Sequence, residues 1–121
     1  MPLTEEIKDA ARQLGQALHQ DEYIRIYLDA LQATQTDPEA NALEKEMYEV
    51  YEGLIERQQA GEDLSQDDTR AFYELRRQVA HHPLISHRND MLNTIRPYLH
   101  QVAEEISFIL GVDYPALTKP Q

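Results

Sequence analysis

The sequence contains no cysteine, which excludes disulfides, thiolate catalysis and thiolate metal sites. A chain without disulfides also suits a reducing compartment, and we expect a cytoplasmic protein. Tryptophan is absent as well, and there are only 2 phenylalanines. Because β-branched and aromatic residues are sparse whereas Leu and Ala are frequent, the composition favours helices over strands.

Basic residues are scarce. The chain has 11 Lys and Arg against 22 Asp and Glu, a net charge of -11, and its longest basic run is Arg76-Arg77. Since binding to phosphates requires clustered cations, we expect no direct contact with nucleic acid. No apolar run approaches the roughly 18 residues of a membrane span, and the N-terminus lacks the basic and apolar segments of a signal peptide. We therefore expect no membrane association.

The usual signatures of catalysis are missing too. With 4 well-separated glycines there is no phosphate-binding loop, and no serine lies in a Gly-x-Ser-x-Gly turn. Glu44, Glu104 and Glu105 invite comparison with di-iron bundles, but those sites need Glu-x-x-His motifs, which this chain lacks. The sequence therefore predicts no catalytic residue and no cofactor, and we expect a protein that is not an enzyme.

What is present is a succession of helix signals. Helix-capping residues, two of them followed by proline, precede five apolar-periodic segments. The starts are Thr4, Asp21, Asp37-Pro38, Ser65 with Asp68, and His82-Pro83; Gly61 and Gly111 are placed as C-terminal stops. These signals predict an all-α protein of about five amphipathic helices in an antiparallel bundle with a long C-terminal helix. We expect one domain over residues 1–111 and a loose tail over residues 112–121.

The last helix carries the most regular pattern in the chain. Apolar residues recur at spacings of 3, 4, 3, 4 and 3, a heptad seam typical of helices that pack knobs into holes. Pro97 lies within the seam without changing its phase, so we expect a kink and not a break. A chain this short has a thin core, and the seam can be covered within the chain or by a second subunit. The seam residues are Leu92, Ile95, Leu99, Val102, Ile106 and Ile109.

Two other groups of residues leave alternatives open. Tyr23 with Tyr27, and Tyr48 with Tyr51, recur at helical spacing, which suits the edge of a core or the anchors of an interface. The histidines allow a metal-binding helical bundle as an alternative function, although solvated or capping roles explain them more simply. That histidine set is His81, His82, His87 and His100. A small acidic export-type chaperone is a further alternative.

The order of these segments resembles the YlbF/YmcA family of small bacterial regulatory proteins. Residues 14–18 (LGQAL) precede Tyr23 and Tyr27, residues 37–40 (DPEA) open a long helix, and residues 82–85 (HPLI) open the last helix. The likeness covers about residues 5–111. It implies a helical, non-enzymatic regulator that self-associates, as a dimer or larger homo-oligomer, or pairs with sister family proteins.

The resemblance also implies a cellular role and, for some relatives, a cofactor. Members of the family act in competence, sporulation and biofilm formation, partly by assisting an endoribonuclease that processes messenger RNA. Some relatives hold an iron–sulfur cluster through cysteines. Because this chain has none, that cluster cannot be carried over by cysteine ligation.

Overall fold

The computed structural model describes residues 1–120, and every regular element in that range is a helix. The helices are α1 (Glu5–Gln20), α2 (Glu22–Thr36), α3 (Pro38–Gln59), α4 (Gln66–His81), α5 (Pro83–Leu110) and α6 (Tyr114–Leu117). The predicted all-α class with a long C-terminal helix is confirmed. The short α6 lies within the segment expected to be a loose tail.

Local hydrogen bonds explain why the helices begin where they do. The Thr4 hydroxyl accepts the N–H of Ile7 at 3.2 Å and opens α1. Ser65 and Asp68 form a reciprocal capping box at the start of α4, with each side chain accepting the other's backbone N–H. Gly111 follows α5 with a φ of 78°, a left-handed conformation that glycine adopts without strain. Helix α5 runs through Pro97 without interruption.

The helices fall into two units. The central unit comprises Leu28–Asn89, and the terminal unit comprises Met1–Tyr27 together with residues 90–120. Helices α2 and α5 are each divided between the two units. That residues 1–111 form a single domain therefore stays a prediction, and each unit is described by itself.

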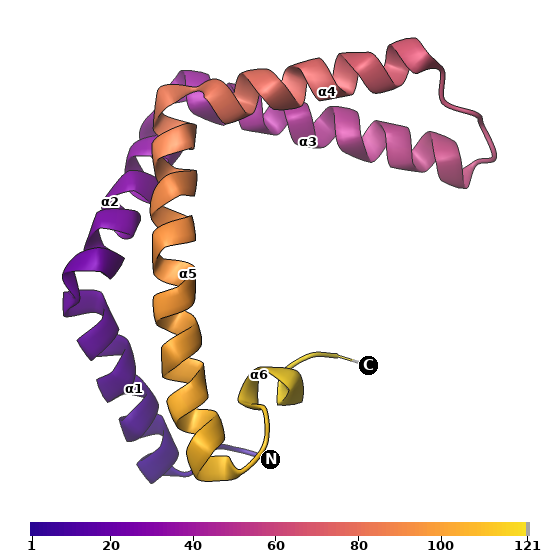
Figure 1. Ribbon diagram of the computed structural model, residues 1–121. Helices are drawn as coiled ribbons and strands as arrows, with labels where there is room; N and C mark the ends of the chain where they lie inside the picture. The colour runs from indigo at the N-terminus through magenta and orange to yellow at the C-terminus, as the bar shows by residue number, and fades with distance from the viewer. Residues whose placement is uncertain (121) are drawn as a thin grey trace. The chain divides into compact units, whose positions relative to one another are not determined.

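The central unit contains the better-packed core. Ala40, Val79 and Ile85 are buried, and Leu43, Met47 and Leu75 pack against them. Helices α3 and α4 lie side by side and antiparallel (Figure 1). The buried Thr34 hydroxyl of α2 donates to the carbonyls of Ala30, at 3.0 Å, and Leu84, at 3.4 Å.

A bidentate ion pair joins α5 to α3 in the same unit. Arg88 Nη1 lies 2.7 Å from Glu44 Oε1, and Arg88 Nη2 lies 2.9 Å from Glu44 Oε2. The two side chains are only 17% and 20% exposed. Two parallel charge-assisted hydrogen bonds in a half-buried position fix the orientation of both partners.

Candidate functional site

The exposure of the heptad seam to solvent varies along α5. Ile95 is 3% exposed, Leu99 is 36% exposed and Ile109 is 82% exposed. Leu92, Val102 and Ile106 are half-buried. The seam thus contributes a core residue near the middle of α5, and its C-terminal end faces solvent.

Helix α1 leaves most of its apolar face exposed, and only Leu18 of that face is half-buried. Its apolar residues share one stripe because Ile7, Ala11, Leu14 and Leu18 are spaced 4, 3 and 4 apart. No residue of this helix is buried, and Ile7 and Leu14 are 54% and 39% exposed. An amphipathic helix is normally stabilised by burying its apolar stripe, so this stripe is available for contact. We call the α1 stripe, together with Leu99 and Ile109, the open seam.

The start of α2 is held to α5 through a single carboxylate. Asp21 Oδ1 accepts the N–H groups of Tyr23, at 2.9 Å, and Ile24, at 3.2 Å. Asp21 Oδ2 accepts a 2.7 Å hydrogen bond from the phenol of Tyr98. That phenolic bond, assisted by the two backbone bonds, lowers the pKa of Asp21, and the same bond raises the pKa of Tyr98.

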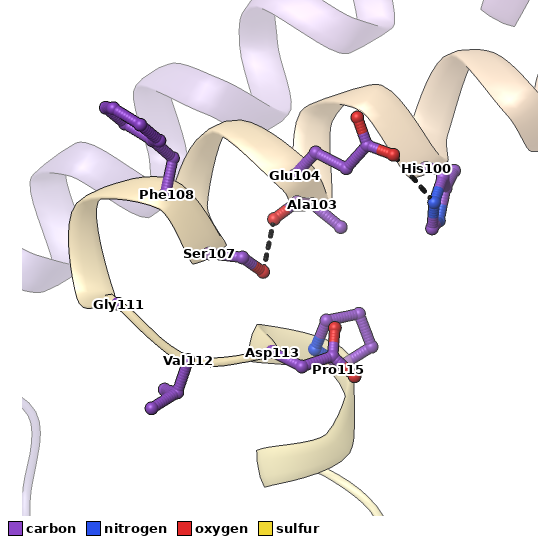
Figure 2. A pocket seen from close by; sticks show the side chains of 9 residues that line it. All are labelled: His100, Ala103, Glu104, Ser107, Phe108, Gly111, Val112, Asp113 and Pro115. Carbon is purple, nitrogen blue, oxygen red and sulfur yellow. Dashed lines mark hydrogen bonds and ion pairs between the residues drawn. The ribbon is translucent and has the colours of Figure 1, made fainter.

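Beside the exposed end of the seam lies a shallow hollow between the last turns of α5 and α6 (Figure 2). The Ser107 hydroxyl donates to the Ala103 carbonyl at 2.9 Å and accepts the Tyr114 N–H at 2.8 Å, which ties α6 to α5. His100 Nε2 lies 2.9 Å from Glu104 Oε1. Ser107 is therefore bonded to backbone groups, and the described contacts give it no imidazole partner that could act as a base.

His81 and His82 also have local partners, whereas His87 is exposed. The His81 ring lies 2.8 Å from the Arg77 carbonyl through Nδ1. His82 Nε2 lies 3.8 Å from Asp37 Oδ2, and the backbone N–H of His82 caps α4 by bonding to Val79. Among residues 1–120, no three His, Asp or Glu side chains converge as a metal ion requires. Within residues 1–120, none of the helices has both the length and the hydropathy of a membrane span.

Long-range pairing assigns a structural role to Glu44, which sequence reasoning had considered only as a possible metal ligand. Its carboxylate forms an ion pair with Arg88, which lies 44 positions later in the chain. The Asp21–Tyr98 bond, across 77 positions, has no signal in the sequence. Spacing and composition predict faces of helices, but they do not say which faces meet.

Comparison with known proteins identifies a family and two curated relatives. The family model described as "Control of competence regulator ComK, YlbF/YmcA" matches residues 7–110. A "UPF0342 protein" of Lactobacillus helveticus is 40% identical over 73 residues, which is 60% of this chain and 63% of that protein. One of Lactobacillus acidophilus, "UPF0342 protein LBA1592", is 36% identical over the same extent. The matched region is thus less than two thirds of these curated relatives. No solved structure is significantly similar.

Proposed function

The chain belongs to the YlbF/YmcA family, and from this premise we propose that it is a non-enzymatic regulatory protein that works by binding other proteins. Its first partner is a second copy of itself, and it acts as an accessory subunit in bacterial regulation. Sister family proteins and an RNA-processing subunit are the further partners that the family relationship suggests.

The open seam is the observation that carries this proposal. A helix of 16 residues with an apolar stripe and no buried side chain is unusual in an isolated soluble protein. Ile109, at 82% exposed, extends the same apolar character onto the end of α5. A second copy of the chain offers matching stripes, so two copies can bury apolar residues that one copy leaves in water.

Light scattering coupled to size exclusion tests the proposal. We expect the unmodified protein to be a dimer or larger, and Ile109→Glu or Leu14→Glu to give a folded but smaller species, because a buried unpaired charge disfavours the interface. Leu99→Glu reports on the middle of the seam, and its unfolding would place Leu99 in the protomer core.

Gln101→Glu is the matched control. It adds the same charge at an exposed position on the opposite face of α5, and it should leave the oligomer unchanged. A monomeric unmodified protein at about 100 µM, far above the dissociation constants of stable dimers, would overturn self-association. Equal masses for all variants would remove the open seam from the interface. Copurification from native cells then identifies the heterologous partner.

A further inference from the structure

The distal half of the α3–α4 hairpin has no buried core of its own. Within residues 48–73 no side chain is buried. Even the apolar residues between the two helices, among them Leu54, Ile55 and Phe72, are only half-buried. A pair of antiparallel helices is normally stabilised by further helices that cover its apolar side, as in a four-helix bundle. This half of the hairpin therefore has an apolar side that is available for such a cover.

That side carries aromatic rings around an apolar hollow. The ring centroids of Tyr51 and Phe72 are 5.7 Å apart, and those of Phe72 and Tyr73 are 5.8 Å apart. Tyr51 and Tyr73 are 49% and 57% exposed. Leu54 and Ile55 line the hollow, and none of its lining residues carries a charge. We call these rings and the hollow the hairpin face. It lies within the central unit, whereas the open seam belongs to the terminal unit.

The unpaired carboxylates of these two helix segments are turned away from the hairpin face. Glu49, Glu52, Glu56 and Asp67 each lie two residues from a residue that lines the hollow. Positions two apart on a helix do not share a face. Two copies of this acidic chain can therefore meet through the hairpin face without bringing these carboxylates together.

The two helices of the hairpin also differ in charge. Helix α3 has six glutamates against one lysine and one arginine, whereas α4 has three acidic residues and three arginines. Two of the three acidic residues of α4 lie in its first turn. Arg76 lies one helical turn beyond Tyr73 on the same side of α4, and it has no ion pair within residues 1–120. The α4 edge of the hairpin face is therefore complementary in charge to α3.

We propose that two copies of the chain pack their hairpin faces together, with α3 of one copy lying over α4 of the other. A two-fold axis parallel to the hairpin produces this arrangement, because it exchanges the two helices between the layers. The exposed rings of Tyr51 and Tyr73 are then buried, and Arg76 of one copy lies near the acidic α3 of the other. The inference rests on the proposed function in one respect, that the protein binds copies of itself. It adds a second surface, so the two together give an oligomer larger than a dimer.

The reactivity of a single thiol tests the proposal, because the chain has no cysteine of its own. Gln58→Cys places a thiol in the lining of the hollow. At about 100 µM protein it should react with an excess of an aromatic disulfide reagent at least about tenfold more slowly than the same variant carrying Tyr73→Glu, for a dissociation constant of about 1 µM or below. The reason is that a charge at Tyr73 opposes burial of the hairpin face. Arg76→Glu leaves the rings in place and should speed the reaction as well.

Two matched controls lie on the same helices. Ala71→Glu adds the same charge two residues before Tyr73, on the other side of α4, and should leave the slow reaction unchanged. Glu56→Cys places the thiol two residues before Gln58, and its rate should not depend on Tyr73→Glu. Helicity and the urea midpoint of each variant show that it is folded.

Equal rates for Gln58→Cys with and without Tyr73→Glu would overturn the inference, since the hairpin face would then be bare or reserved for a different protein. Repeating the measurement with Ile109→Glu separates the inference from the proposed function. A reaction that stays slow supports the hairpin face independently of the open seam. A mass that falls with Ile109→Glu, together with a fast reaction throughout, would refute the hairpin face alone. A mass that falls with Tyr73→Glu but not with Ile109→Glu would refute only the open seam.

Discussion

The phenol of Tyr98 donates a 2.7 Å hydrogen bond to Asp21 Oδ2, and Asp21 at the same time caps the first turn of α2. The Asp21 backbone N–H also closes α1 by bonding to the Leu18 carbonyl at 3.1 Å. One residue therefore ends one helix, starts the next and binds a third. The rings of Tyr23 and Tyr98, with centroids 6.5 Å apart, pack beside this bond.

Tyr98→Phe should make stability less dependent on pH. The Tyr98 hydrogen bond is the largest cause of the lowered pKa of Asp21. A carboxyl whose pKa is lower when folded contributes stability above its unfolded pKa, near the ordinary 3.8, and that contribution is lost as the pH falls through the folded value. Near neutral pH, the variant should unfold at a lower urea concentration than the unmodified protein. This difference in urea midpoint should shrink as the pH falls below the unfolded pKa of Asp21.

Urea unfolding followed by circular dichroism across the acid range measures this effect. Tyr73→Phe is the control, because the described contacts give its hydroxyl no hydrogen bond and its exposed ring packs on Phe72. It should lower the urea midpoint little and alter the pH profile even less. Identical profiles for the two variants would mean that the Asp21–Tyr98 bond does not persist in solution.

The Arg88–Glu44 pair should contribute more to the free energy of unfolding than any exposed ion pair of the chain. Glu44→Gln keeps the shape of the side chain but removes its charge, and we expect it to cost roughly 1.5–3 kcal/mol, as for hydrogen bonds to charged groups. The double variant with Arg88→Met should be less destabilised than the sum of the two single changes, because the partners interact directly. Urea unfolding supplies the free energies for this cycle.

Glu46→Gln gives the matched control on the same helix. Glu46 is exposed, so this substitution should change the free energy of unfolding by no more than about 0.5 kcal/mol. If Glu44→Gln changed the free energy of unfolding equally little, the bidentate pair would contribute no more to stability than a surface ion pair.

The sequence is sufficient to place the helices because their boundaries are set by neighbours within a few residues. Thr4 contacts Ile7, and Ser65 contacts Asp68, so each cap is determined by a stretch of four residues. The same locality explains why α5 could be extended through Pro97 from the unchanged phase of its apolar residues. The short α6 escaped prediction because an element of four residues is too short for helical periodicity to be recognised.

The seam shows where this reasoning ends. Ile95 and Ile109 are equivalent in the heptad pattern, yet one is 3% exposed and the other 82%. Periodicity identifies the apolar face of a helix, but what covers that face depends on contacts made by distant segments or by another chain. For the same reason the sequence could name Glu44 as a carboxylate of interest and could not supply Arg88 as its partner.

The same substitution at two glycines should have opposite effects. Gly15 lies inside α1, and a Cβ there would meet no atom within 4 Å. Gly15→Ala should therefore stabilise the helix by about 0.5–1 kcal/mol. Gly111 has a φ of 78° and donates its N–H to the Ser107 carbonyl at 2.8 Å. Gly111→Ala forces a side chain into a left-handed conformation and should cost about 1–2 kcal/mol.

Urea unfolding of the two variants, with light scattering at the same protein concentration, checks both signs. Gly15 is close to Ala11 on the apolar stripe of α1, so the oligomeric mass adds independent information. A Gly15→Ala protein that is more stable and keeps its mass shows that this position tolerates a methyl group. One that is less stable and smaller would contradict the prediction, because a second copy would then lie against Gly15 too closely for a side chain.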